Sequence, residues 1–395
     1  MKKILVSDIK EGAIFSEPVY IEGNNLLVPA GVAVRKKDLG RLKSWGIETV
    51  ETNGKMVPAE IVERAEAEAK LKAEEEKSAK KPSSVISHPD INENKGAYRS
   101  YLDLIERLEE VCNNISSGIS VEARSIDSIT GRLLQAIREQ RNSFIGYILG
   151  GEITGHAMSK NLVNTAILSA LTAQEMKLPN HKIMQIVTGA LLHDVGMLRM
   201  PKEIVEKKGG LSEAELQRIQ SHPLYTYKIV NKELLYPEDV GLIVLQHHER
   251  WDGEGYPRRI AGTAIDLGAR IVSVADAFEA MVSQKPYRNS MMGYQAMKNL
   301  LSDNLRRFDP DVIKAFIQTM GIYPIGSIIL LNNGALARVM EVQPTAPLRP
   351  KIKILIDEFG KTFTQDNGEE IDLLIEKSLF IAKAVDPKEL ADKNA

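Results

Sequence analysis

The sequence predicts a mainly α-helical protein with a small α+β unit near its start and a small β domain near its end. Apolar residues recur at spacings of three and four from about residue 97 to 320, as in Leu102, Ile105 and Leu108, which is typical of helices with one buried face. Turn signals between short β-prone runs occur on either side of this stretch. We therefore expect four segments: 1–56, 57–96, 97–321 and 322–395.

Residues 1–56 have the pattern of an α+β accessory unit. Two β-prone runs at 19–21 and 26–28 flank the turn at 22–25, which is a signal for a β-hairpin. A helix is expected at 37–45, and a strand follows at 48–51.

Residues 57–96 are expected to form a charged helix and then a polar loop. The part up to residue 81 is rich in Ala, Glu and Lys, and Glu66 precedes Lys70 by four positions. Such pairs stabilise an exposed helix. An exposed spacer helix is the main interpretation. A short dimerising coiled coil is the alternative, so a homodimer remains open.

The helical and β patterns continue through the two remaining segments. Within 97–321 the helical spacing recurs at Ile126, Ile129 and Leu133. From 322 onward the pattern changes, and strands are expected at 327–331, 336–342 and 351–356. The pair Asn333-Gly334 favours a tight turn after the first of these strands.

The composition limits the kinds of site the chain can build. Cys112 is the only cysteine, so a metal site has to rest on histidine and carboxylate ligands. The net charge of −2 gives no reason to expect binding to a DNA or RNA duplex, which favours basic surfaces. The sequence contains no run of about 18 apolar residues that could cross a membrane. Its start does not resemble a signal peptide. We therefore expect no membrane contact and a cytoplasmic protein.

Five of the seven histidines are candidate ligands within the helical segment, together with several carboxylates. His156 opens a predicted helix on its apolar face, and Glu152 lies four residues before it. His193 and Asp194 follow the apolar run 183–192. Gly196 is expected to end that helix, and two adjacent metal ligands fit best where a helix ends and the backbone turns.

The other candidates also lie at helix ends or on apolar faces. His222 is followed by a proline at a first-turn position, and His247 and His248 follow the apolar run 240–245. Asp276 lies within an apolar helix, where a buried carboxylate is costly unless it is paired or metal-bound. Each residue alone fits a core histidine or a salt bridge, but together they suit two or three divalent ions.

The ligand types indicate a metal and a chemistry. Imidazole and carboxylate ligands favour Fe, Mn, Co or Zn over Ca or Mg. Asp194 is the natural bridge, because a carboxylate can offer one oxygen to each of two metals. A metal pair suits phosphodiester hydrolysis, since it lowers the pKa of bound water to about 7 and clamps the phosphoryl oxygens.

The order of these motifs resembles the HD-GYP subgroup of the HD-superfamily phosphohydrolases over about residues 150–320. The motifs that carry the resemblance are His193-Asp194, His222-Pro223, the run HHERWDGEGYP at 247–257, Asp276 and Pro286-Tyr287-Arg288. It implies a helical HD-type domain with a bi- or trinuclear centre, with iron expected first and manganese second. It further implies that a metal-bridging hydroxide opens cyclic di-GMP to pGpG, and in some members continues to GMP.

The resemblance also implies roles for individual residues. His193 and Asp194 would be catalytic as well as metal-binding, and Glu152 matches an extra ligand of members with three metals. The implied metal ligands are Glu152, His156, His193, Asp194, His222, His247, His248 and Asp276.

The expected substrate contacts follow the metal ligands in the chain. Gly253 and Gly255 let the backbone bend close to a ligand, and Tyr256 offers a ring and a hydroxyl. Lys285 and Arg288 are the candidate phosphate contacts.

The chain departs from the family pattern at two places. Met197 stands where the family usually has lysine, and Arg199 is the candidate to replace that charge. Thr226 stands where glycine is common, and we expect this change to matter less.

Three hypotheses remain at this point. The first is a cyclic di-GMP phosphodiesterase. The second is a receptor without turnover that signals to a partner protein through the N-terminal unit or the β domain. The third is a phosphohydrolase of another nucleotide, such as cyclic GMP-AMP.

Overall fold

The computed structural model divides into two compact units, Met1–Ser83 with Ala395 and Ser84–Asn394, and each is described by itself. The structure describes residues 2–21, 25–28, 34–44, 47–57, 95–150, 157–207, 209–283, 291–302, 304–363 and 367–386. Within these ranges no helix is long and apolar enough to cross a membrane.

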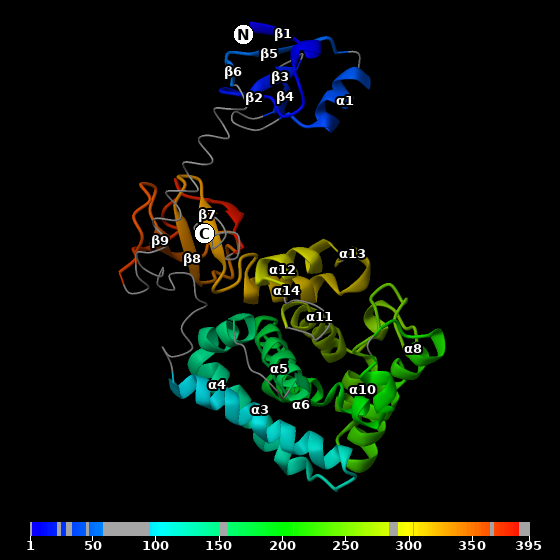
Figure 1. The fold of residues 1–395 in the computed structure, drawn as a ribbon. Coiled ribbons are helices and arrows are strands. Elements are labelled where there is room, and N and C mark those ends of the chain that lie inside the picture. Colours follow the sequence, from blue (N-terminus) through cyan, green and yellow to red (C-terminus); the bar gives the residue numbers. More distant parts are fainter. Residues whose placement is uncertain are drawn as a thin grey trace, which may run out of the picture. The chain divides into compact units, whose positions relative to one another are not determined.

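In the residues that the structure describes, the first unit is a small antiparallel sheet with one α-helix (Figure 1). Its elements are β1 (Lys2–Leu5), η1 (Val6–Asp8), β2 (Ile14–Phe15), β3 (Val19–Ile21), β4 (Asn25–Val28), α1 (Lys36–Ser44), β5 (Thr49–Thr52) and β6 (Met56–Val57). The main sheet has the order β1-β5-β3-β4, and β2 pairs with β6. The predicted hairpin is confirmed, because Val19 pairs with Val28.

Phe15, Val19, Leu42 and Val50 form the centre of this unit's hydrophobic core. The predicted helix and the predicted strand at 48–51 are also confirmed as α1 and β5. Residues 58–94, which hold most of the predicted charged helix and the loop after it, lie outside the described residues.

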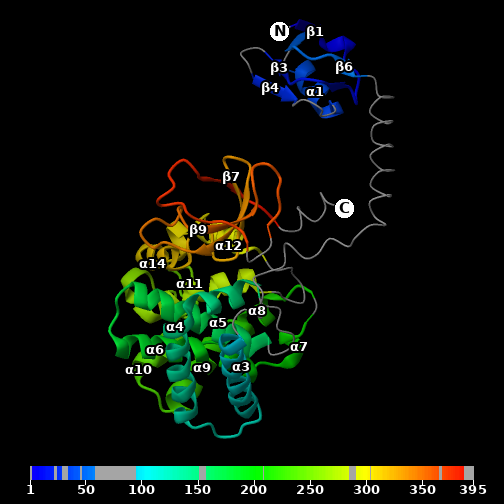
Figure 2. The same ribbon diagram turned by 90° about the vertical axis from the view of Figure 1, so that its left-hand side faces the viewer.

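The second unit begins with a large helical part, shown from two sides in Figures 1 and 2. Its elements are α3 (Lys95–Ser116), α4 (Ala123–Gly150), α5 (Ala157–Glu175), α6 (Asn180–Leu192), η2 (Val195–Arg199), α7 (Lys202–Val205), α8 (Glu213–Ile219), α9 (His222–Lys228), η3 (Ile229–Glu233), α10 (Glu238–Gln246), η4 (Gly262–Ala264), α11 (Leu267–Val282), α12 (Gly293–Ser302), α13 (Asn304–Arg307) and α14 (Pro310–Met320).

Local sequence explains where several of these helices start. Ser212 caps α8, and its hydroxyl accepts from the Glu215 backbone while the Glu215 carboxylate accepts from the Ser212 backbone. Asp266 caps α11 and Asp309 caps α14, each through a side-chain oxygen that accepts from backbone N–H groups of the first turn.

Helix α5 is the centre of the helical part. Nearly every residue from Leu162 to Ala173 is buried, so the helix packs on all sides, against α3, α4, α6, α11 and α14. A single hydrophobic core extends from Ala97 on α3 to Met320 on α14. Helices α3 and α4 therefore share the core that supports the rest of the helical part.

The chain ends in a five-stranded antiparallel sheet with the order β10-β9-β8-β7-β11. Its strands are β7 (Ile328–Leu331), β8 (Leu336–Glu341), β9 (Lys351–Ile356), β10 (Glu370–Asp372) and β11 (Ile381–Ala384). The three predicted strands are confirmed, and Gly334 has a φ of 90° in the turn between β7 and β8. The mainly helical class with a small β domain is therefore confirmed, while the predicted boundaries at 57, 97 and 322 stay predictions.

Candidate metal centre

Six predicted ligands come from four separate helix regions. His193 follows the last residue of α6, and Asp194 immediately precedes η2. His222 is the first residue of α9, and His247 and His248 follow α10. Asp276 lies in the middle of α11. The adjacent ligand pairs therefore stand where a helix ends, and there successive side chains can converge on one point.

Three imidazoles are oriented in the same way by the backbone. Nδ1 of His193 lies 2.8 Å from the carbonyl oxygen of Ala190. For His222 the partner is Ile219, at 2.9 Å, and for His247 it is Val244, at 2.7 Å. A carbonyl oxygen can only accept, so Nδ1 carries the proton of each neutral ring and Nε2 keeps a free lone pair. This is the usual support of a metal-binding histidine.

The carboxylate of Asp194 lies between His193 on one side and His222 and His247 on the other. Its Oδ1 is 3.0 Å from Nε2 of His222 and 3.6 Å from Nε2 of His247. Its Oδ2 faces the other way and lies 3.7 Å from Nε2 of His193. On that second side Oδ1 of Asp276 is 3.6 Å from the same His193 nitrogen. Asp194 thus offers one oxygen to each side.

The first side fits a metal ion. One ligand atom from each of Asp194, His222, His247 and His248 lies within 4.8 Å of all the others. Nε2 of His222 and Nε2 of His247 are 3.4 Å apart, which matches two nitrogens that each lie about 2.1 Å from one ion. Oδ1 of Asp194 is buried without a hydrogen bond. These lone pairs face one another, and a cation among them would compensate their burial.

The electrostatics of the cluster agree with this reading. Burial alone would raise the pKa of Asp194, but the imidazoles of His193 and His222 lower it well below its usual value. Burial lowers the pKa of His193, yet the carboxylates of Asp194 and Asp276 outweigh it and raise that pKa to about 9. Burial and the neighbouring imidazoles lower the pKa of His248 well below its usual value. The carboxylates thus favour positive charge on the His193 side, while the imidazole of His248 stays neutral.

The loop after His248 folds back onto the cluster. The Tyr256 ring lies 4.7 Å from the His248 ring at 33°, and the Tyr256 N–H donates to the carbonyl oxygen of His248 at 3.2 Å. Gly255 permits this return, because an added Cβ would overlap the backbone of Glu249 and Arg250. Burial, and then the Asp194 and Asp276 carboxylates, raise the pKa of Tyr256, so its hydroxyl stays a neutral donor.

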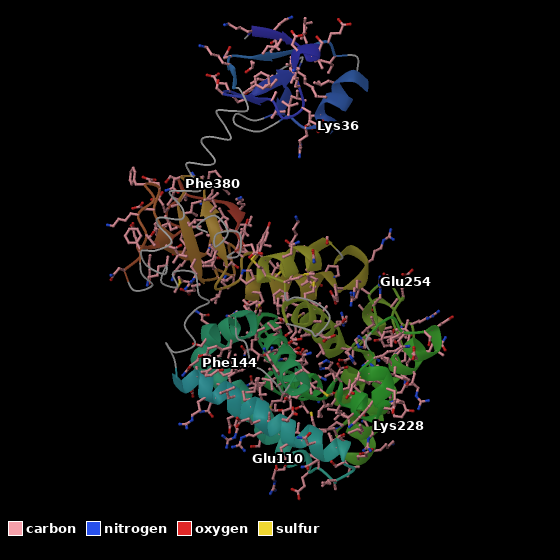
Figure 3. The ribbon with its side chains drawn as sticks, in the orientation of Figure 1. Lys36, Glu110, Phe144, Lys228, Glu254 and Phe380 are labelled. Atoms are coloured by element: carbon pink, nitrogen blue, oxygen red, sulfur yellow. The ribbon has the colours of Figure 1, made fainter. Side chains whose placement is uncertain are left out.

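A glycine conformation and an ion pair also shape this loop. Gly253 has a φ of 80°, a left-handed conformation that favours glycine. The guanidinium of Arg250 binds the carboxylate of Asp252 with two hydrogen bonds of 3.0 and 2.7 Å. Glu254 points outward at the edge of the helical part (Figure 3). The predicted contacts Gly253, Gly255 and Tyr256 thus lie on one ordered loop beside the histidines.

Comparison with known proteins places this geometry in a family. An HD domain model matches residues 152–312, and a model of the KOW domain associated with HD domains matches residues 328–393. The HD domain match covers the six clustered residues and the loop that ends in Gly255-Tyr256-Pro257. Residues 152–312 thus match the HD domain family.

Several curated relatives share this region. Cyclic di-GMP phosphodiesterase PdeB of Borreliella burgdorferi is 28% identical over 75% of this chain and 78% of its own. Cyclic di-GMP phosphodiesterase PA4108 of Pseudomonas aeruginosa is 33% identical over 50% of this chain, which spans about half (47%) of that relative. The 3'3'-cGAMP-specific phosphodiesterase 3 of Vibrio cholerae is 34% identical over 40% of this chain and 34% of its own.

Among solved structures, the HDG"Y"P protein Bd1817 from Bdellovibrio bacteriovorus covers 80% of this chain and 97% of its own. Its TM-score is 0.46 and its identity is 20%.

Four residues expected from the HD-GYP resemblance lie outside the described residues. Glu152 and His156 precede the start of α5, and Lys285 and Arg288 follow the end of α11. Their roles stay predictions.

The structure corrects the reading of Gly196. This residue does not end a helix in a left-handed conformation, because it lies inside η2 and is not among the described glycines with positive φ. Its small size is needed instead for packing, since an added Cβ would overlap the carbonyl oxygen of His222 and the side chain of Thr226. Glycine here brings η2 and α9 into direct contact.

Arg199, the candidate to replace the missing lysine charge of the HD-GYP pattern, pairs with a carboxylate. Its guanidinium lies 3.4 Å from a carboxylate oxygen of Glu233 on η3, and it is not among the groups that shift the pKa of Asp194. The replacement of the lysine charge by Arg199 stays a prediction.

Sequence reasoning missed Arg307 at the end of α13. Its carbonyl oxygen accepts the Trp251 N–H at 2.9 Å, which ties α13 to the loop that carries Tyr256. Its positive charge opposes the rise in the Tyr256 pKa that burial causes. The residue is exposed, and no ion pair with it appears among the described residues. The pair Arg306-Arg307 is visible in the sequence, but nothing local relates it to residue 256.

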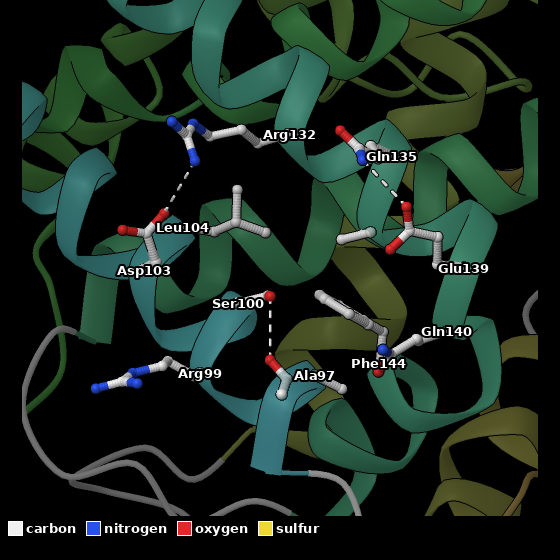
Figure 4. A pocket seen from close by; sticks show the side chains of 12 residues that line it. Ala97, Arg99, Ser100, Asp103, Leu104, Arg132, Gln135, Glu139, Gln140 and Phe144 are labelled. Atoms are coloured by element: carbon white, nitrogen blue, oxygen red, sulfur yellow. Dashed lines mark hydrogen bonds and ion pairs between the residues drawn. The ribbon is translucent and has the colours of Figure 1, made fainter.

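A cavity of about 440 Å³ lies elsewhere, between α3 and α4 (Figure 4). Arg99, Asp103, Arg132, Glu139 and Phe144 are among the residues that line it, and none of the predicted site residues does so. Its charged side chains are largely paired, as Arg132 is with Asp103 at 3.9 Å. The cavity therefore does not belong to the histidine cluster.

Proposed function

We propose that this protein is a metal-dependent phosphodiesterase that hydrolyses cyclic di-GMP. The observation that carries the proposal is the divided carboxylate of Asp194, with Oδ1 facing His222 and His247 and Oδ2 facing His193. A carboxylate with imidazole nitrogens on both sides suits a pair of divalent ions. When bound, such ions supply hydroxide at neutral pH and stabilise the charge that develops on the phosphoryl oxygens.

The chain's own residues divide into two groups of ligands. His222, His247, His248 and Oδ1 of Asp194 would hold one ion. His193, Asp276 and Oδ2 of Asp194 would hold the second. We propose that His156 completes the second group, and that Glu152 serves a third ion.

Substrate binding is proposed for the loop beside the cluster. The Tyr256 hydroxyl is kept protonated by its buried surroundings, so it can donate a hydrogen bond to a phosphate or guanine oxygen. Gly255 lets the loop backbone lie against that of Glu249 and Arg250, and Gly253 supplies a turn with positive φ. Lys285 and Arg288 are proposed phosphate contacts, because guanidinium and ammonium groups bind phosphate well. Cyclic di-GMP is the proposed substrate because it is named for relatives in several organisms.

Two alternatives are each favoured by one observation. Met197 leaves the turn after Asp194 without the usual cation, which favours a receptor that binds the dinucleotide without turnover. Relatives of Vibrio cholerae named as specific for 3'3'-cGAMP match this chain as well, which favours a different cyclic dinucleotide.

The test is turnover by the full chain, purified without oxygen and supplied with iron or manganese. Wild type should hydrolyse cyclic di-GMP, and Asp194→Ala should lose both bound metal and turnover. The matched control is Asp239→Ala, which removes an exposed carboxylate that pairs with Lys182 at 2.8 Å, and it should keep both.

The outcomes separate the alternatives. Metal-loaded wild type that binds cyclic di-GMP without cleaving it contradicts the enzyme proposal, and Met197→Lys then tests the receptor reading. Faster cleavage of 3'3'-cGAMP than of cyclic di-GMP contradicts the substrate assignment.

Finer features are proposed on the same basis. We propose iron before manganese, pGpG as the first product, and the cytoplasm as the compartment. A homodimer, and a signalling partner that binds the first unit, are further proposals that size measurement and binding assays would test.

A further inference from the structure

A chain of buried hydrogen bonds joins three helices that support the metal centre. The Tyr101 hydroxyl on α3 donates to Oδ1 of Asn164 on α5 at 2.7 Å. Nδ2 of Asn164 then donates to Oε1 of Glu279 on α11 at 3.2 Å. The Ser283 hydroxyl donates to the same Glu279 oxygen. The hydrogen bonds thus run from Tyr101 through Asn164, and from Ser283, to the Glu279 carboxylate.

This network of hydrogen bonds lies inside the apolar core. Tyr101, Asn164 and Glu279 are each fully buried, with an exposed fraction of 0%, and Ser283 is 6% exposed. Burying a carboxylate is costly unless hydrogen bonds satisfy it. Well-packed apolar residues often give equal stability in such places, so a satisfied buried network is better suited to fixing one arrangement than to adding stability.

Glu279 is well placed to fix the position of α11. Asp276 lies three residues before it, almost one helical turn away. A slide or rotation of α11 on α5 would break the bond from Asn164. The same movement would change the 3.6 Å distance between Oδ1 of Asp276 and Nε2 of His193. By fixing the register of α11, Glu279 would therefore also fix the position of Asp276, a proposed metal ligand.

The hydrogen-bond network also extends beyond the HD domain. Helix α3 precedes the matched region, which begins at residue 152, yet it supplies Tyr101. A second bond joins the same two helices, because the Ser159 hydroxyl donates to Glu109 on α3 at 2.6 Å. Ser159 lies three residues after His156. Helix α3 therefore holds α5 at two points.

We propose that Tyr101, Asn164 and Glu279 are positioning residues for the metal centre. They hold α11, and with it Asp276, in register on α5. They act through backbone position and touch neither substrate nor the reacting atoms. The inference rests on the metal centre of the proposed function and does not depend on which dinucleotide is cleaved.

The sharpest variant is Asn164→Asp, which exchanges one NH₂ group for an oxygen. The change keeps the acceptor for Tyr101 but places two carboxylate oxygens face to face at the Glu279 contact. Tyr101→Phe is milder, because it removes only the hydroxyl. Each has a matched control in the helical part. Asn231→Asp changes a residue that donates to the Tyr236 carbonyl oxygen, and Tyr98→Phe changes a neighbouring tyrosine of α3 that contacts Tyr147.

The measurement is the affinity of the full chain for Mn²⁺, by competition with a chelator and without any nucleotide. Thermal unfolding of the metal-free protein is recorded in parallel. We expect Asn164→Asp to weaken Mn²⁺ binding about tenfold, as for loss of outer partners of metal ligands, and Tyr101→Phe to weaken it less. Asn231→Asp and Tyr98→Phe should bind Mn²⁺ like wild type even where they unfold earlier.

Affinities of Asn164→Asp and Tyr101→Phe equal to those of their controls would overturn the inference. If Asn164→Asp does not fold, Tyr101→Phe against Tyr98→Phe decides alone. Wild type that binds Mn²⁺ but cleaves no cyclic dinucleotide sinks the proposed function and leaves this comparison valid. Wild type that binds no Mn²⁺ or iron overturns both.

Discussion

The backbone N–H of Gly196 donates to the hydroxyl oxygen of Thr226 at 3.0 Å. That hydroxyl in turn donates to the carbonyl oxygen of His222 at 3.0 Å. The turn after Asp194 is thus tied to the first turn of the helix that begins at His222. Thr226, which stands where glycine is common in the family, therefore matters more than its sequence position suggested.

Replacing Thr226 by valine should destabilise the protein by about 1–3 kcal/mol, because valine keeps the shape but leaves the buried Gly196 N–H without an acceptor. Thr226→Ser keeps the hydroxyl and should lose less. Chemical denaturation of both variants measures the difference. A valine variant as stable as the serine variant would show that this hydroxyl does not hold the turn.

Gly255→Ala should disrupt the loop that carries Tyr256, because an added Cβ overlaps the backbone of Glu249 and Arg250. We expect a loss of several kcal/mol in stability, since backbone atoms cannot move aside cheaply. Gly131→Ala in α4 is the control, where nothing lies near the added Cβ and helix propensity should add about 1 kcal/mol. Denaturation curves would contradict the prediction if the two variants changed stability in the same direction.

Arg307→Ala should raise KM for the dinucleotide about tenfold with little change in kcat, because an exposed cation held beside the Tyr256 loop suits a charge-assisted contact to phosphate. Arg306→Ala removes the preceding arginine and serves as the control, with KM expected near the wild-type value. Steady-state kinetics of both variants decide the matter. Equal KM values would exclude a substrate contact by Arg307.

Removing metal should lower the thermal stability of the wild type. A ligand that binds only the folded state at about 100 times its Kd stabilises that state by about 2.7 kcal/mol. Chelation should therefore lower Tm in wild type and in Asp239→Ala, and should leave Asp194→Ala unchanged. Unfolding followed with and without a chelator checks this. An equal Tm shift in Asp194→Ala would place the stabilising ion elsewhere.

Much of the fold could be predicted because it depends on local pattern. The hairpin of β3 and β4, helix α1 and strands β7 to β9 all follow turn residues and short-range periodicity. The helix ends that carry His193 and His247 follow from where apolar runs stop, and the helix start at His222 follows from Pro223. The long motif at 247–257 made the family recognisable without any knowledge of distances.

Other expectations failed or were missing because they depend on partners far apart in the chain. Gly196 was assigned to a helix end, but its small size is required by its contact with α9, which begins 26 residues later. Arg199 was a candidate cation for the site, yet it pairs with Glu233. The sequence did not predict Arg307 or the hydrogen-bond network that links Tyr101 to Glu279, because nothing local relates these residues to the site.

By itself, the sequence determined which residues of this protein can bind metal and which helix ends carry them, because residue type and periodicity are local properties. Only the tertiary structure decided that Asp194 divides its two oxygens between His222 and His193, and that Glu279 holds α11 against α5. Those relationships are distances between helices, and they are set by the packing of a shared core that no single segment specifies.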